Sequence, residues 1–137
     1  MEKIVIDANV LFATLISNNR KTRLLLSEGQ YQFFAPKFLF VELFEHKDII
    51  IQKSKLAEVE VYELLDNLLQ HIHFVSNDFI STSQYWQAYR LCKDVDENDT
   101  PFVALTLALG ARYWTRDDTL KRHLRQQGFN LLFEPFI

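Results

Sequence analysis

Four acidic residues lie where the hydrophobic pattern of the chain changes or where a charge interrupts an apolar run. They are Asp7 after KIVI (3–6), Glu42 within FLFVELF (38–44), Asp99 before TPFVALTLALG (100–110) and Asp117 after ARYWT (111–115). Carboxylates that converge without partners repel one another, so their convergence would require cations to offset the charge. Oxygen ligands suit Mg²⁺ or Mn²⁺, not zinc, and such ions can activate water for phosphodiester hydrolysis.

The segment 94–118 (DVDENDTPFVALTLALGARYWTRDD) predicts how two of these acids are positioned. Asp99, with a proline two positions later, is typical of a helix start, where it would act as the capping side chain. Gly110 is suited to end this helix, because glycine adopts the left-handed conformation at no steric cost. Residues 111–115 predict a short buried strand, and Asp117 follows its end. A rigid helix and a rigid strand would therefore hold Asp99 and Asp117 near one edge of a sheet.

The three glycines of the chain indicate an alternating architecture. Each follows a helical pattern and precedes a strand-like run: YQFFA (31–35), ARYWT (111–115) and NLLFE (130–134). This alternation predicts an α/β protein with a mostly parallel sheet. Asp7 would then lie at the carboxyl end of the first strand, the edge where such sheets bind ligands. Neither a GxGxxG motif nor a P-loop occurs, so no nucleotide cofactor held by a glycine loop is expected.

Length and composition set further bounds. The 137 residues predict a single domain spanning 1–137, and the 48% hydrophobic and 24% charged content is ordinary for a globular protein. The one cysteine, Cys92, cannot form an internal disulfide and fits a reducing cytoplasm. The most apolar run, residues 33–44, is too short to span a membrane. A net charge of −3 means that any binding to nucleic acid must come from local patches.

Order and spacing of the acidic motifs resemble those of the PIN-domain family, small metal-dependent ribonucleases that include many prokaryotic toxins. The matching segments are VIDANVL (5–11), FLFVELFEH (38–46) and DENDTPFVALTLALGARYWTRDDTL (96–120). By this resemblance Asp7, Glu42, Asp99 and Asp117 are the catalytic acids and metal ligands. Asn9 and Thr115 would orient these acids without binding the metal themselves, although Asn9 could instead cap the first helix. The loop before Asp99 departs from the commonest toxin pattern, because Asp96 and Glu97 are also available as ligands.

The resemblance implies a three-layer α/β/α sandwich with a central, mostly parallel sheet. It also implies a Mg²⁺- or Mn²⁺-dependent endoribonuclease that forms a homodimer and, as a toxin, is neutralised by a small antitoxin protein. RNA would be bound by local positive charge near the acids, for which the candidates are Arg116, Lys121, Arg122 and Arg125. An aromatic-rich helix over residues 79–93 is interpreted as packing and not as a platform for bases.

Two alternatives remain open. A PIN-like module could bind RNA and cleave it weakly or not at all, although none of its four acids is replaced. A metal-dependent phosphatase with Asp7 as nucleophile would resemble an aspartate-x-aspartate motif at the first strand. Asn9 occupies the second position of that motif, which argues against the phosphatase.

Overall fold

The computed structural model describes residues 1–136, so Ile137, the last residue of the predicted domain, lies outside the described part. At its centre is a parallel sheet in the order β3-β2-β1-β4. Its strands are β1 (Glu2–Ile6), β2 (Tyr31–Pro36), β3 (Ile72–Val75) and β4 (Arg112–Trp114). In register, Ile4 of the central strand β1 pairs with Phe33 on one side and with Arg112 on the other.

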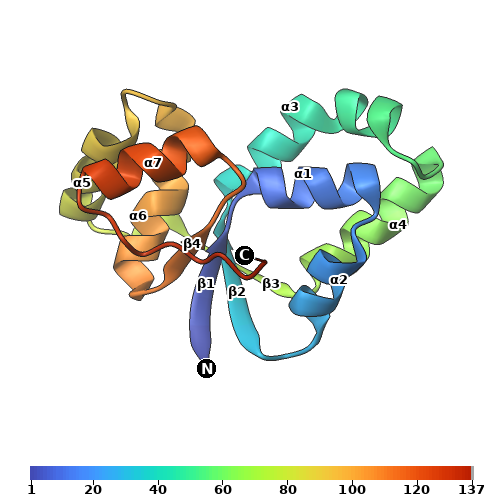
Figure 1. The fold of residues 1–137 in the computed structure, drawn as a ribbon, viewed down its shortest axis with the longest axis horizontal. Coiled ribbons are helices and arrows are strands. Elements are labelled where there is room, and N and C mark those ends of the chain that lie inside the picture. The colour runs from blue at the N-terminus through green and yellow to red at the C-terminus, as the bar shows by residue number, and fades with distance from the viewer. Residues whose placement is uncertain (137) are drawn as a thin grey trace.

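Seven α-helices and two short 3₁₀ turns surround this sheet within residues 1–136. The α-helices are α1 (Ala8–Ser17), α2 (Arg20–Ser27), α3 (Phe38–Lys53), α4 (Glu58–Leu69), α5 (Thr82–Cys92), α6 (Thr100–Leu109) and α7 (Asp118–Gln126), and the turns are η1 (Asn77–Phe79) and η2 (Glu97–Asp99). Helices α1 to α4 lie on one side of the sheet and α5 to α7 on the other (Figure 1). The predicted α/β/α sandwich with a parallel sheet is therefore confirmed.

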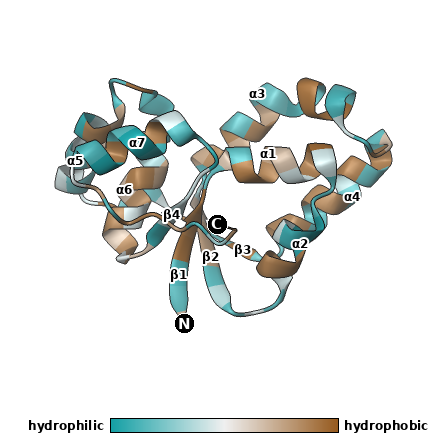
Figure 2. Cartoon of the chain, viewed as in Figure 1, coloured by the Kyte–Doolittle hydropathy of each residue, from teal (hydrophilic) through white to brown (hydrophobic). Residues whose placement is uncertain are grey.

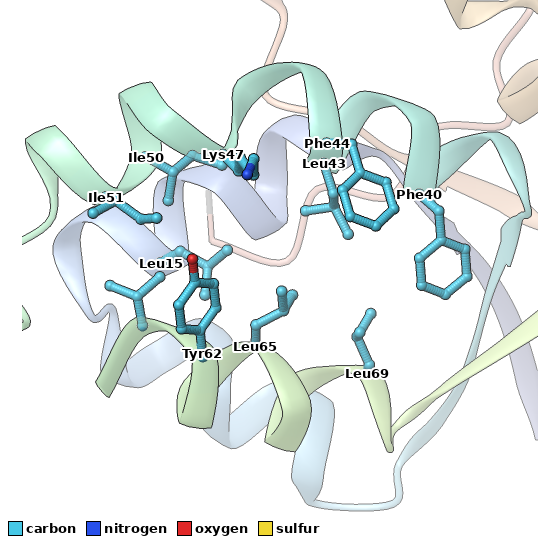
Figure 3. A pocket seen from close by; sticks show the side chains of 11 residues that line it. Leu15, Phe40, Leu43, Phe44, Lys47, Ile50, Ile51, Tyr62, Leu65 and Leu69 are labelled. Carbon is cyan, nitrogen blue, oxygen red and sulfur yellow. The ribbon is translucent and has the colours of Figure 1, made fainter. Parts of the chain in front are cut away.

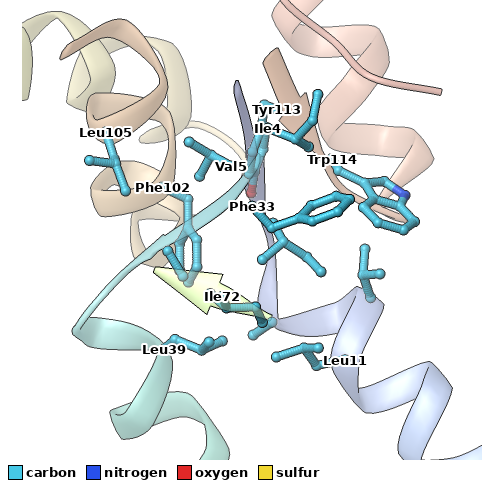
Figure 4. Close-up of a cluster of buried hydrophobic side chains, with 14 of the residues drawn as sticks. Ile4, Val5, Leu11, Phe33, Leu39, Ile72, Phe102, Leu105, Tyr113 and Trp114 are labelled. Carbon is cyan, nitrogen blue, oxygen red and sulfur yellow. The ribbon is translucent and has the colours of Figure 1, made fainter. Parts of the chain in front are cut away.

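Alternation of apolar strands with helices explains the layers. The second half of β1 is fully buried, and α6 is buried along most of its length because it packs against β1, β2 and β4. The buried part of β1 and much of α6 are hydrophobic, whereas the visible face of α7 is mostly hydrophilic (Figure 2). In the core, Phe33 packs against Trp114 with ring centroids 5.9 Å apart, below the neighbouring side chain of Tyr113 (Figure 4).

Gly110 ends α6 as the sequence predicts. Its φ of 62° is left-handed, and the chain turns there directly into β4. A side chain at this position would meet no neighbouring atom, so the requirement for glycine comes from the backbone conformation and not from space.

A strand over 130–134 is not formed, and that prediction is wrong. Only one parallel bridge is made, between Tyr113 and Leu132, supported by hydrogen bonds from Tyr113 N to Leu131 O (2.7 Å) and from Phe133 N to Tyr113 O (2.8 Å). The neighbouring strand β4 has only three residues, so it offers little ladder to pair with. Pro135 then stops any extension, because proline has no N–H to donate.

Across residues 1–136, no helix combines the length and the apolar character that crossing a membrane requires.

Candidate active site

The reversal of strand order puts the switch point of the sheet between β1 and β4. From β1 the chain passes to β2 and β3 on one side, and it then returns to add β4 on the other side. In open α/β sheets, the carboxyl ends of the two strands at such a switch point flank the ligand-binding crevice. Asp7 directly follows β1, and Thr115 to Asp117 directly follow β4. Two of the predicted site segments therefore lie together at this switch point.

Asp7 is held from three sides. Its backbone N–H donates to the Trp114 carbonyl (2.9 Å), which joins the ends of β1 and β4. Its Oδ1 accepts from the N–H of Ala8 (2.8 Å) and caps α1, and its Oδ2 accepts from the hydroxyl of Thr115 (2.8 Å). The residue is only 3% exposed, so burial is the main cause that raises the pKa of its carboxyl to about 6. These bonds fix the orientation of the carboxylate.

Thr115 is the central residue of the hydrogen-bond network at this switch point. Besides donating to Asp7, its hydroxyl oxygen accepts from Asn9 Nδ2 (3.0 Å) and from the backbone N–H of Asp117 (3.2 Å). Asn9 in turn accepts from the backbone N–H of Arg116 through Oδ1 (3.0 Å). Asn9 is not the cap of the first helix, because α1 already begins at Ala8 with Asp7 as its cap. Asn9 instead ties the start of α1 to the turn after β4.

Asp117 has a double position. It is half-buried and caps α7, since its Oδ1 accepts from the N–H of Leu120 (3.0 Å). Its negative charge is also one of the causes that raise the pKa values of Asp7 and Asp99. The carboxylate therefore borders the same site, with one oxygen already engaged by the helix.

Asp99 does not cap α6, and that prediction is wrong. Its backbone is helical (φ −76°, ψ −13°) because the turn η2 runs directly into α6, whereas a capping side chain requires an extended backbone. The residue is 8% exposed and makes no capping hydrogen bond. Burial raises its pKa to about 8, followed by the charges of Asp7, Asp96, Glu42 and Asp117. Its carboxyl is thus directed into the acidic site and not into its own helix.

Glu42 reaches the site from α3. It is partly buried, and its Oε1 is shielded from solvent without any hydrogen-bond partner. Its pKa is raised to about 8, first by burial and then by the charges of Asp7, Asp96 and Glu45, in that order. Glu45 itself is exposed, so it belongs to the rim. A buried carboxyl oxygen without a partner is costly, which indicates that Oε1 of Glu42 is available to bind a ligand.

Of the two additional acids in the loop, Asp96 lies closer to the site. Its charge acts on both Glu42 and Asp99, whereas Glu97 is not among the charges that perturb either group. Asp96 is exposed, and its side chain accepts from the N–H of Asn98 (2.9 Å). Asp96 is therefore an exposed neighbour of these acids at the N-terminal end of η2.

Oxygen donors of this kind fit a hard divalent cation. Among residues 1–136, no three His, Cys, Asp or Glu side chains are already gathered closely enough to coordinate one ion. The acids nevertheless perturb one another, all of the donors are carboxylates, and Glu42 Oε1 lacks a partner. That donor set suits Mg²⁺ or Mn²⁺ because both prefer carboxylate oxygen.

Two buried residues, Tyr113 and Cys92, are influenced by the charges of Asp7 and Asp99, and neither was predicted from the sequence as part of the site. The hydroxyl of Tyr113 is fully buried and has no hydrogen bond of standard geometry, yet it faces Asp7, Asp99 and Cys92. Burial raises the pKa of the Cys92 thiol to about 12, with the charge of Asp99 as the next cause. The available signal was strand alternation, since Tyr113 is two residues before Thr115 and shares its face.

The predicted cationic residues divide into two kinds. Lys121 pairs with Glu134 (2.9 Å) and Asp118 (3.1 Å), and Arg125 pairs with the same Glu134. Arg116 and Arg122 are exposed, and neither takes part in an ion pair within residues 1–136. Arg116 also lies between Thr115 and Asp117, next to the acids.

A second, chemically different feature is an apolar groove of about 190 Å³ between α3 and α4 (Figure 3). Its walls include Phe40, Leu43 and Phe44 of α3 and Tyr62, Leu65 and Leu69 of α4. Lys47 is the one charged side chain that lines it, and Phe44 is 72% exposed. The groove is therefore an apolar surface, chemically distinct from the acidic site.

The fold and the candidate site together define an α/β/α protein with a parallel sheet and with carboxylates from separated elements near its switch point. Comparison with protein families matches residues 5–131 to the PIN domain. The chain therefore belongs to the PIN-domain family, as the sequence motifs indicated.

Among solved structures, the chain is similar to one described as the crystal structure of VapBC2 from Rickettsia felis bound to a DNA fragment from their promoter. The TM-score is 0.63 at 17% sequence identity, and the match covers 96% of this chain and 97% of that one. This similarity establishes the shared fold. A comparison with curated protein sequences finds no match.

Proposed function

We propose that this protein is a Mg²⁺- or Mn²⁺-dependent endoribonuclease whose catalytic acids are Asp7, Glu42, Asp99 and Asp117. The observation that carries the proposal is the electrostatic influence of Asp7 on both Glu42 and Asp99, three acids that come from separate elements. Each of these carboxyls has a raised pKa, mainly through burial; the charge of Asp7 contributes to the shifts of Glu42 and Asp99, and that of Asp117 to the shift of Asp7. Membership of the PIN-domain family supports the same reading.

Asp7, Glu42 and Asp99 would hold the cation, with Asp117 and Asp96 at the border of the site. When bound, the ion would supply an activated water and would offset negative charge on the phosphodiester. Thr115 and Asn9 fix the orientation of Asp7 through the bonds described above. Their proposed role is therefore to position a ligand, as groups behind metal ligands generally do.

The deciding assay compares single-stranded RNA with a small phosphomonoester, each with Mg²⁺, Mn²⁺ or EDTA. A nuclease cleaves the RNA internally, and EDTA stops the cleavage. Release of phosphate without RNA cleavage would identify a phosphatase instead. RNA binding without either reaction would identify a regulatory module. The variant Asp7→Asn, checked for folding by circular dichroism, must lose the activity if it comes from this site.

The partner part of the proposal is that the protein is a toxin neutralised by a small antitoxin protein. The groove between α3 and α4 supports this, since its exposed Phe44 and Phe40 would be covered by a bound apolar segment. A protein of the same fold occurs in a structure described as VapBC2 bound to promoter DNA. Growth arrest on expression, relieved by a neighbouring gene product, tests the proposal. Sedimentation of the purified protein tests the predicted homodimer.

A further inference from the structure

One aromatic surface of the molecule has no role in the site described above. Helix α5 carries Tyr85, Trp86 and Tyr89, and Trp86 is 58% exposed. The sequence interpretation of these residues as packing holds for the partly buried tyrosines but not for Trp86. Tyr89 contacts Trp86 edge to face, with ring centroids 5.8 Å apart and planes at 86°. That contact restrains the indole while most of it stays open to solvent.

This surface extends to Thr100, the residue next to Asp99. Two open depressions adjoin it: one of about 360 Å³ is lined by Tyr85, Trp86, Tyr89 and Thr100, and one of about 260 Å³ is lined by Phe38, Tyr89, Glu97, Asn98, Thr100 and Pro101. Tyr89 and Thr100 belong to both. Thr100 directly follows Asp99, so the two depressions share a wall residue that is the sequence neighbour of a predicted metal ligand.

Charge on the same helix suits a polyanion. Arg90 and Lys93 follow Trp86 by four and seven positions, so they lie on the same side of α5. Both are exposed, and neither forms an ion pair in the described chain, residues 1–136. Asp94, Asp96 and Glu97 of the following loop are also exposed and would repel phosphates, which leaves the helix side as the favourable path.

We propose that Trp86 and Tyr89 form a stacking platform for unpaired bases of single-stranded RNA, and that Arg90 and Lys93 contact the adjoining phosphates. Aromatic rings stack on any base, and cations beside them follow the backbone, so this combination favours single strands without strong sequence preference. The inference rests on the proposed nuclease function, because it assigns a path for the same substrate. It would make the enzyme select unpaired RNA, since paired bases cannot reach the indole.

The test measures binding in EDTA, where a metal-dependent nuclease would not consume the probe. The chain has two tryptophans, and Trp114 is 5% exposed, so a quench by oligoadenylate reports mainly Trp86. We expect single-stranded oligoadenylate to quench the fluorescence and the matching duplex RNA to leave it unchanged. With labelled oligoadenylate, Trp86→Ala should weaken binding by roughly tenfold. Trp86→Phe should keep affinity within about threefold, because an aromatic face remains.

Tyr62→Ala is the matched control, because Tyr62 is an aromatic residue of α4 that is 47% exposed and lines the other groove. It should bind oligoadenylate like the wild type. Equal affinity of Trp86→Ala and wild type would overturn the platform even if RNA is cleaved. Loss of affinity in both Trp86→Ala and Trp86→Phe would overturn stacking as the mechanism. A change of sedimentation state in Trp86→Ala would assign the surface to contact between chains and overturn the proposal as well.

These outcomes are separable from those of the proposed function. Binding that depends on Trp86, without cleavage in either metal, would retain the platform and remove the nuclease. Cleavage that is unaffected by Trp86→Ala would do the reverse. If both hold, Trp86→Ala should raise KM for single-stranded RNA and leave kcat within about twofold, because the platform binds substrate away from the reacting phosphate.

Discussion

The hydroxyl of Thr115 donates a 2.8 Å hydrogen bond to Oδ2 of Asp7, although the two residues are 108 positions apart in the sequence. The bond joins the carboxyl ends of β1 and β4 at the switch point of the sheet. Asn9 Nδ2 donates to the oxygen of the same hydroxyl, and the hydroxyl proton is donated to Asp7. The orientation of this hydroxyl is therefore fixed by its surroundings, and the carboxylate of Asp7 is fixed with it.

Removal of that hydroxyl should reduce activity without unfolding the chain. We expect Thr115→Val to lower metal-dependent cleavage by about 10–100-fold, the usual effect of losing a group behind a metal ligand. Thr115→Ser keeps the hydroxyl and should retain most of the activity. Cleavage rates and metal affinity of both variants, with circular dichroism as the folding check, provide the measurement. A Val variant as active as the Ser variant would show that the hydroxyl does not matter.

Asp7→Asn should abolish cleavage. The amide can still accept from the N–H of Ala8 and cap α1, so the local structure should persist. It lacks the charge that a hard cation requires, so the site should lose its metal. Isothermal titration with Mn²⁺ and an RNA cleavage assay on the same sample check both statements. Near-wild-type cleavage would remove Asp7 from the site.

The fold was predictable because its signals are local. Apolar runs that end at Gly110 and at Asp7 define alternating helices and strands. Each run can be recognised in the sequence without knowledge of the segments that pack against it. The predicted strand over 130–134 failed for a tertiary reason, since its length is limited by the three residues of β4. A single sequence does not show how long a partner strand is.

Candidate residues for the site could be named from the sequence, but their contacts could not. Asp99 was assigned to a helix cap because Asp before Thr-Pro usually caps, yet the preceding turn η2 makes its backbone helical and frees the carboxyl. The proximity of Tyr113 to Asp7 depends on the strand order of the sheet, which no local sequence pattern predicts. The exposure of Trp86 likewise depends on which side of α5 packs against α6. These features arise from long-range packing and therefore appeared only in the structure.

Salt dependence should distinguish the exposed cations from the paired ones. On single-stranded RNA each phosphate contact contributes about −0.7 to the slope of log affinity against log salt. We expect Arg122→Ala and Arg116→Ala each to flatten the slope by about this amount. Arg125→Ala should change it less, because Glu134 already neutralises that side chain.

Glu134→Gln gives the complementary test. It would release Lys121 and Arg125 from their shared carboxylate, so RNA affinity should rise and the slope should steepen. Filter binding in EDTA over a range of KCl concentrations measures all four variants. A slope that none of them changes would mean that this cluster does not contact RNA.

Stability of the metal-free protein should fall as pH rises. Burial and neighbouring carboxylates raise the pKa of Asp99 from 3.8 to about 8 and that of Glu42 from 4.5 to about 8. At pH values between the unfolded and the folded pKa of each group, the folded state binds more protons than the unfolded state. The free energy of unfolding therefore decreases with increasing pH. In EDTA, the melting temperature should therefore be several degrees lower near pH 8 than near pH 5. Asp99→Asn carries no such charge, so its melting temperature should be higher than that of the wild type near pH 8, by roughly 5 °C.

Divalent metal should reverse this dependence, because it binds the deprotonated carboxylates of the folded state. Millimolar Mg²⁺ or Mn²⁺ should therefore raise the wild-type melting temperature more near pH 8 than near pH 5, and raise that of Asp99→Asn less. Glu63→Gln, which removes an exposed carboxyl on α4, is the matched control and should behave like the wild type. Differential scanning calorimetry of the three proteins, with EDTA and with metal, makes the comparison. If the wild type gains no stability from either metal at either pH, the four acids do not form a cation site, and the proposed hydrolysis loses its basis.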